Sequence, residues 1–332
     1  MACGEGPTLR QQGKVRSSDA SLTRGQPAVA RAGRCRYASR DCLQGAAVSV
    51  HSPSADAPVG IFDSGVGGLS IWREIVRELP HESTVYVADQ AHVPYGPRTQ
   101  EEIRAFCDGI TEFLLTAGCK AIVVACNTAS AAALKHLRER FPHLPLVGLE
   151  PAVKPAAAIT RSGVIGVMAT PATFQGRLYQ ATVGRHAAGV KVIARVCAGL
   201  AELVEAGHLD DPDTDVRLKE YLQPILDAGA DTIVLGCTHY PFVIESIRRV
   251  SGPSVTVIDP APAVARHLRN VLLHHGLHRH AGEGSHRFLT TGPATHFEAL
   301  AGRLTGKSVS AEAIRWDRGR LGDAQLATSP AA

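Results

Sequence analysis

The chain has 332 residues, which is enough for two domains of ordinary size, and its 45% apolar and 20% charged residues are typical of a globular protein. No stretch approaches the ~20 consecutive apolar residues of a membrane span. The net charge of +4 arises in residues 1–57 and the remainder is neutral, so we expect no nucleic-acid footprint on the body. Eight cysteines are spread over a long chain without a secretory segment, which predicts free thiols in a reducing cytoplasm.

Residues 1–57 are rich in Arg, Ser, Ala and Gly and show no periodicity, which predicts a disordered extension. Translation from upstream of the true start and a transit peptide remain alternatives, although acidic residues and the lack of an amphipathic stripe argue against the transit peptide. At the other end, residues 318–332 are predicted to be a frayed tail.

The body opens with a predicted strand at Val59–Phe62 and a polar loop at 63–68. Apolar residues then recur at helical spacing up to Leu79, and Pro80 ends that helix. "STVYVAD" predicts a second strand ending at Asp89, and residues 101–118 predict a helix closed by glycine.

An internal repeat organises the rest of the chain. "AGCKAIVVACNT" (117–128) aligns without gaps on "AGADTIVLGCTH" (228–239), and each copy is followed by an acid–proline pair, at 150–151 and 259–260. "VGIFDSG" from Val59 likewise aligns on "IGVMATP" from Ile165. The repeat predicts two copies of one α/β unit with mainly parallel sheets.

Each long repeat contains a cysteine, Cys126 or Cys237, at the carboxyl end of its predicted strand. Ligands bind at such ends in open α/β sheets. A helix is expected to start after each thiol and to lower its pKa, which favours the thiolate. Two facing units would put one thiol on each side of a substrate carbon, an arrangement that suits racemisation or epimerisation. A Cys–His hydrolase needs only one thiol. Cys107, Cys119 and Cys197 are interpreted as buried structural residues.

Polar residues near the thiols suggest an amino-acid substrate. Asn127, Thr128, Thr170, Thr173 and Thr238 offer amide and hydroxyl groups, and the N–H groups of "DSGVGG" suit a carboxylate. That loop is not a dinucleotide fingerprint, because a serine stands where GxGxxG needs its third glycine.

Two acid–base side chains accompany the thiols. Asp63 is expected to pair with a substrate ammonium or to orient Cys126, and His239 to assist Cys237. A zinc site is disfavoured because no CxxC occurs and Cys237 with His239 gives two ligands at most, so no metal is expected.

"GIFDSGVGGLS", "PYGPR", "VACNTAS" and "LGCTHYP" together resemble the glutamate racemase group of the cofactor-independent aspartate/glutamate racemases, over about Val59 to Gly306. The resemblance implies an enzyme without cofactor, in the bacterial cytoplasm, that supplies D-glutamate for peptidoglycan. It implies that Cys126 and Cys237 are the acid–base thiols, with Asp63 assisting the first and His239 plus an acid assisting the second. It implies these substrate contacts: Asp63 and Ser64, Tyr95 and Gly96, Asn127 and Thr128, and Thr238 and His239.

The assisting acid is assigned to Glu205. The surrounding "CAGLAELVEAG" departs from the family pattern, since Ala198 and Glu202 replace two usual prolines, and Glu202 remains an alternative.

The resemblance also implies the domain organisation. The expected fold is two similar α/β domains related by a pseudo-twofold repeat, with the active-site cleft between them. The first domain would comprise residues 58–150 and 260–317, and the second residues 151–259.

Two rival functions stay open: racemisation of aspartate or a related amino acid, and non-catalytic amino-acid binding, which has no need of both thiols. The expected partner is glutamate, with neither nucleic acid nor membrane. The oligomeric state is open, with a homodimer as one alternative.

Overall fold

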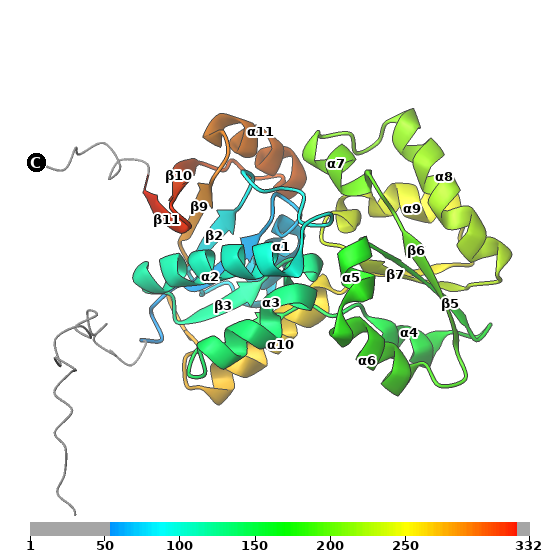
Figure 1. Ribbon diagram of the computed structural model, residues 1–332, viewed down its shortest axis with the longest axis horizontal. Coiled ribbons are helices and arrows are strands. Elements are labelled where there is room, and N and C mark those ends of the chain that lie inside the picture. Colours follow the sequence, from blue (N-terminus) through cyan, green and yellow to red (C-terminus); the bar gives the residue numbers. More distant parts are fainter. Residues whose placement is uncertain (1–53, 324–332) are drawn as a thin grey trace, which may run out of the picture. The chain divides into compact units, whose positions relative to one another are not determined.

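The computed structural model describes residues 54–323, so most of the predicted N-terminal extension and the last residues of the predicted tail lie outside it. The strands are β1 (Val59–Asp63), β2 (Thr84–Ala88), β3 (Ala121–Val124), β4 (Leu146–Gly148), β5 (Val164–Ala169), β6 (Lys191–Val196), β7 (Thr232–Gly236), β8 (Thr256–Ile258), β9 (His286–Thr290), β10 (Ala311–Asp317) and β11 (Arg320–Asp323) (Figure 1). The helices are α1 (Leu69–Glu78), α2 (Gln100–Thr116), α3 (Asn127–Arg140), α4 (Val153–Ile159), α5 (Pro171–Gln175), α6 (Arg177–His186), α7 (Leu200–Glu205), α8 (Pro212–Asp227), the 3-10 helix η1 (Tyr240–Val243), α9 (Ile244–Ser251), α10 (Ala261–His274) and α11 (Ala294–Thr305).

These elements form two sheets that share a run of four strands in the same order. The first sheet has the order β11-β10-β9-β2-β1-β3-β4 and the second β6-β5-β7-β8. All neighbours are parallel except the β10–β11 pair. The run β2-β1-β3-β4 therefore matches β6-β5-β7-β8 strand for strand. The predicted α/β class and the repeat seen in the sequence are confirmed at the level of topology.

Helices cover both faces of each sheet, which explains why the strands read as continuous apolar runs. In β1, Val59 and Ile61 pack with residues of α1, α10 and α11, whereas Phe62 packs with residues of α2 and α3. In the second sheet, Met168 of β5 packs toward α7, α8 and α9, whereas Val167 packs toward α4 and α6.

Local signals set the element ends near the site. The N-terminus of α2 carries a capping box, in which the Thr99 hydroxyl accepts from the Glu102 N–H and the Glu102 carboxylate accepts from the Thr99 N–H. Gly118 follows the helix with φ 80°, a left-handed conformation that glycine adopts without strain. The predicted first strand and both predicted helices are confirmed within a residue or two.

The C-terminal prediction is wrong over 318–323. Arg318 and Gly319 turn the chain, and β11 then pairs antiparallel with β10, with Leu321 opposite Trp316. The side chain of Leu321 joins the core under α2. Pairing with β10, which is joined to β11 by a tight turn, offsets the low β-strand propensity of "DRGRLGD".

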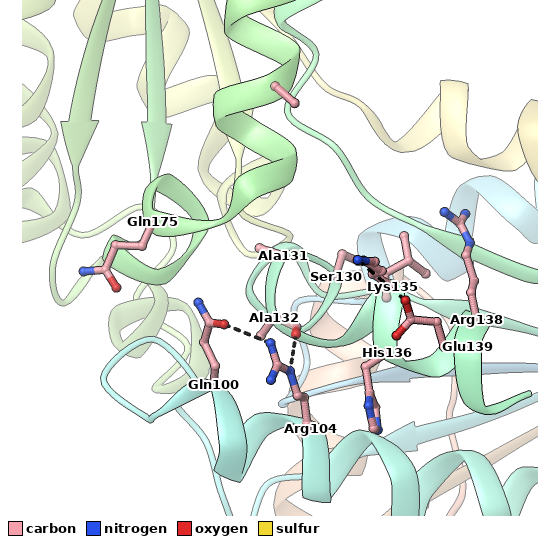
Figure 2. Close-up of a pocket in the computed structure, with 12 residues that line it drawn as sticks. Gln100, Arg104, Ser130, Ala131, Ala132, Lys135, His136, Arg138, Glu139 and Gln175 are labelled. Atoms are coloured by element: carbon pink, nitrogen blue, oxygen red, sulfur yellow. Dashed lines mark hydrogen bonds and ion pairs between the residues drawn. The ribbon is translucent and has the colours of Figure 1, made fainter. Parts of the chain in front are cut away.

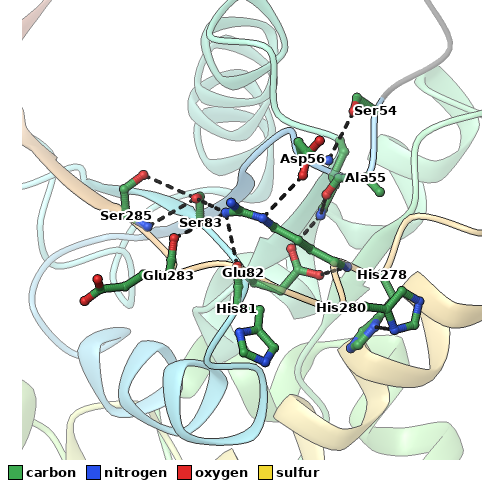
Figure 3. Close-up of polar contacts among 12 residues, drawn as sticks. Ser54, Ala55, Asp56, His81, Glu82, Ser83, His278, His280, Glu283 and Ser285 are labelled. Carbon is green, nitrogen blue, oxygen red and sulfur yellow. Dashed lines mark hydrogen bonds and ion pairs between the residues drawn. The ribbon is translucent and has the colours of Figure 1, made fainter.

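The end of the predicted extension, Ser54–Ala57, contacts the body at the amino ends of the strands (Figure 3). The buried Lys120 donates to Ala55 O at 2.5 Å and to Glu82 Oε2 at 2.5 Å, and Arg279 Nε lies 3.3 Å from Asp56 Oδ1. A buried ion pair of this kind requires both partners, because removal of one leaves an uncompensated charge.

Within residues 54–323, no helix combines the length and the apolar character that a membrane crossing needs.

Candidate functional site

The two thiols follow equivalent strands but different local structures. Cys126 comes two residues after β3 and is the N-cap of α3, as the sequence predicted. Cys237 follows β7 directly, but the next element is the 3-10 helix η1, and α9 begins only at Ile244. The helix predicted after "CTHYPF" is confirmed as α9, but η1 lies between it and the thiol, so Cys237 is not at the N-terminus of an α-helix.

Cys237 lies in a chain of acid–base groups. Its Sγ is 3.6 Å from Nδ1 of His239, and Nε2 of His239 is 2.7 Å from Oε1 of Glu205. The same carboxylate oxygen accepts from the Val66 N–H at 2.7 Å. Of the two acids left open by the sequence, it is thus Glu205 that contacts His239, whereas Glu202 is exposed.

This arrangement favours a charged imidazole. Burial lowers the pKa of His239, but its hydrogen bonds to Cys237 and Glu205 outweigh burial and raise that pKa well above its ordinary value. Burial raises the pKa of Glu205, but the hydrogen bond and charge of His239, together with the Val66 N–H, lower it overall. The charged imidazole therefore presents Nδ1 to the sulfur of Cys237 and Nε2 to the carboxylate of Glu205.

Cys126 has different surroundings. Burial raises the pKa of its thiol well above the ordinary value and the charge of Asp63 raises it further, whereas the Ala129 N–H, which donates to Sγ at 3.4 Å, opposes them. Burial and the neighbouring carboxylate thus act against the thiolate that the helix N-terminus is expected to favour. Ser64 Oγ lies 4.0 Å from the sulfur.

The loop at 63–68 connects the two groups of side chains. Asp63 Oδ2 accepts from the Gly68 N–H at 2.7 Å, and its charge interacts with His239 and Glu205. Ser70 Oγ donates to Thr238 O at 2.9 Å. A Cβ on Gly67 would lie 2.5 Å from Nδ1 of His239, so only glycine allows this approach.

Three hydroxyl groups form a chain near the thiols. Thr170 Oγ1 lies 2.9 Å from Thr128 Oγ1 and 3.0 Å from Thr173 Oγ1, which joins the start of α3 to the start of α5. Gly96 adjoins this chain, since a Cβ built on it would lie 3.7 Å from Thr170 Cβ.

Two buried polar groups of the candidate site have no hydrogen-bond partner among the described residues. These are Oδ1 of Asp63 and both amide atoms of Asn127, whose residues are 0% and 3% exposed. Buried polar atoms in proteins are nearly always hydrogen-bonded, so these groups are suited to a polar ligand.

Sequence reasoning missed Asp89 and Tyr86. The carboxylate of Asp89 accepts from the OH of Tyr95 at 2.7 Å, and Tyr86 OH donates to Gly65 O at 2.9 Å. The sequence places Asp89 at the carboxyl end of a predicted strand, and an acid at that position is itself a signal of site chemistry.

Among residues 54–323, no group of three or more potential ligands could hold a metal ion. The five described cysteines are free, and all are buried. Cys107 and Cys119 pack in the core under α2 and α3.

A separate cavity of about 700 Å³ is lined by residues of α2, α3, α5 and α6 (Figure 2). Arg104 lies on its wall and donates to Ala132 O and to Gln100 Oε1. Because its lining contains none of the candidate site residues, we do not assign the chemistry to it.

Comparison with known proteins identifies the family of the chain. Residues 60–268 match the Asp/Glu/Hydantoin racemase family. The glutamate racemase of Roseiflexus sp. (strain RS-1) is 49% identical over 255 residues, 76% of this chain and 94% of the relative. The crystal structure of glutamate racemase isoform RacE1 from Bacillus anthracis has a TM-score of 0.74 at 37% identity, over 81% of this chain and 100% of that one. That of glutamate racemase from Francisella tularensis in complex with D-glutamate has a TM-score of 0.70 at 28% identity, over 79% and 98%.

The family match extends over more than half of the chain and includes both thiol-bearing strands, Asp63, His239 and Glu205. The chain therefore belongs to the Asp/Glu/Hydantoin racemase family.

Proposed function

We propose that the protein is an isomerase, a glutamate racemase that interconverts L- and D-glutamate without a cofactor by proton transfer between the α-carbon and two cysteines. The observation that carries the proposal is the pair of buried thiols at equivalent strand ends, each next to a different acid–base partner. The similarity to glutamate racemases over most of the chain supports the substrate.

A two-base mechanism needs one thiol ionised and the other protonated. The two thiols have different surroundings, which supports such a division of roles. His239 lies beside Cys237, whereas burial and the charge of Asp63 raise the pKa of Cys126.

From L-glutamate, Cys237 removes the α-proton, the electron pair stays on the α-carbon, and Cys126 delivers its proton to the opposite face. The product is D-glutamate, and the enzyme holds the thiolate on the other side. In the reverse direction Cys126 removes the proton of D-glutamate. His239 and Asp63 assist their respective thiols.

The buried, unpartnered groups bind the substrate in this proposal. Asp63 Oδ1 suits the ammonium group, and the amide of Asn127 suits a carboxylate. The hydroxyl chain of Thr128, Thr170 and Thr173, together with Gly96, suits the other carboxylate. Ser64, Tyr95 and Thr238 are the remaining substrate contacts that the family motifs imply.

The biological role that follows is supply of D-glutamate for peptidoglycan synthesis in the cytoplasm. It is supported by the family resemblance. The division of the chain into two domains, with residues 260–317 returning to the first, stays a prediction, and so does a homodimer.

The test is racemisation in heavy water with no cofactor added. Starting from L-glutamate, the early D-product should carry deuterium at the α-carbon, and the remaining L-substrate should carry almost none. Cys126→Ser and Cys237→Ser should each strongly depress both directions, because serine is a far weaker acid than cysteine.

Cys119→Ala is the matched control, since that thiol is buried in the core and should be dispensable. L-substrate that gains deuterium as fast as D-product forms would show a single exchanging base and refute the two-thiol mechanism. Parallel assays with L- and D-aspartate decide the substrate, and binding without turnover would identify a non-catalytic binding protein.

A further inference from the structure

The buried carboxylate of Asp89 accepts hydrogen bonds from several side chains. It follows β2 and is 0% exposed. Oδ1 accepts from Trp316 Nε1 at 2.7 Å and from Thr291 Oγ1 at 3.0 Å, and Oδ2 accepts from Tyr95 OH at 2.7 Å. Nδ1 of His92 is 2.9 Å from Oδ2.

These donors come from three separate parts of the chain. His92 and Tyr95 lie in the loop after β2, Thr291 follows β9, and Trp316 is in β10. A buried carboxylate is costly unless it is well hydrogen-bonded, so Asp89 holds the three segments in one arrangement.

Aromatic contacts fix the same loop from its other side. His92 stacks on Phe106 with ring centroids 3.9 Å apart, and Tyr95 and Trp316 also contact Phe106, at 5.7 and 6.0 Å. Arg98 Nε donates to His92 O at 2.6 Å, which ties the end of the loop to its start.

This loop carries two of the expected substrate contacts. Gly96 adjoins Thr170 in the hydroxyl chain, and Tyr95 belongs to the same cluster of buried side chains as Cys126. The position of both residues therefore depends on how the loop is held.

We propose that Asp89 is a positioning residue that fixes Tyr95 and Gly96 for substrate binding. Trp316 of β10 in turn holds the Asp89 carboxylate in place through its N–H. The inference rests on the proposed function, because it concerns the same site. It also assigns a role to the β10–β11 hairpin, which is distant in sequence from the loop after β2 but contacts it through Trp316 and Asp89.

Asp89→Asn tests the proposal. Asparagine keeps the shape but loses the charge, so its hydrogen bonds weaken and KM for glutamate should rise about tenfold. The kcat should stay within about threefold, because no proton-transfer group is changed. Trp316→Phe keeps a ring but lacks the N–H, and should raise KM about threefold.

Asp108→Asn is the matched control. Asp108 is a half-buried carboxylate on α2 that pairs with His136 and Arg140, outside the loop. It should lower the thermal midpoint but leave KM within about twofold.

A double-mutant cycle of Asp89→Asn with Tyr95→Phe separates positioning from general destabilisation. If Asp89 acts through Tyr95, the double variant should raise KM no more than the larger single effect, whereas independent effects multiply. Binding of D-glutamate measured by calorimetry should weaken in parallel with KM.

Unchanged KM and calorimetric affinity in Asp89→Asn, or changes equal to those of Asp108→Asn, would overturn the proposal. If Asp89→Asn does not fold, an unchanged KM in both Trp316→Phe and Tyr95→Phe overturns it equally. A wild-type protein that binds glutamate but does not racemise it refutes the proposed function instead, and leaves the calorimetric comparison valid.

Discussion

The contact between Glu205 and His239 allows a quantitative prediction for Glu205→Gln. Glu205 Oε1 accepts from both the Val66 N–H and His239 Nε2 at 2.7 Å. Glutamine keeps the length and one acceptor oxygen but removes the charge that stabilises the imidazolium. The side chains of His239 and Glu205 are 4% and 14% exposed, so solvent screens their interaction only weakly.

Hydrogen bonds to charged groups contribute about 1.5–3 kcal/mol, against about 1 kcal/mol for neutral ones. If about 2–3 kcal/mol of support for the imidazolium is lost, kcat/KM should fall about 30- to 160-fold. The loss should appear in both directions, since every turnover uses both thiols.

The same variant has a defined pH dependence. Because the folded pKa of His239 is raised, its stabilising contribution is complete below the unfolded value of ~6.5 and is lost as pH rises through the raised value. The lowered pKa of Glu205 adds stability that is present above ~4.3 and is lost as pH falls through the folded value. The difference in free energy of unfolding between wild type and Glu205→Gln should therefore be largest between about pH 5 and 6.5.

The assays are initial rates of racemisation in both directions and urea unfolding across that pH range. Glu202→Gln is the control, since it makes the same chemical change at an exposed position on the same helix. Wild-type activity in Glu205→Gln, or an equal loss in Glu202→Gln, would refute the role assigned to this contact.

Three further predictions concern other parts of the chain. Lys120→Met should lower the free energy of unfolding by about 3–5 kcal/mol in urea titrations, because it leaves the buried carboxylate of Glu82 without its ion-pair partner. Lys135→Met on the exposed face of α3 should have almost no effect. Gly67→Ala should depress kcat, since the added methyl group overlaps the site imidazole, and Gly184→Ala, with open space around it, should be neutral or stabilising; normal turnover in the first would contradict the close approach. Alkylation of Cys126 by iodoacetamide should accelerate with rising pH up to well above the range of a free thiol, as burial raises its pKa; mass spectrometry that finds a plateau near pH 8 would contradict this.

The sequence by itself determined the repeating architecture and the two thiols. Short-range patterns in the sequence predict the buried strands and the end of α2 at a glycine, because strand burial and helix capping act over a few residues. The polar residues after β3 and β7 mark the carboxyl ends of those strands. The repeat of "VVAC" and "VLGC" placed Cys126 and Cys237 at equivalent strand ends, and the matching strand order of the two sheets bears this out.

Only the tertiary structure decided how those groups are tuned. The choice of Glu205 over Glu202, the raised pKa of Cys126 and the contact of Trp316 with Asp89 depend on which distant side chains are packed together. A thiol's pKa reflects its total burial and all nearby charges, so at Cys126 burial and Asp63 oppose the lowering that a helix N-terminus alone predicts. β11 was missed for a similar reason, since a polar strand is stabilised by its partner across the sheet and leaves no apolar period in the sequence.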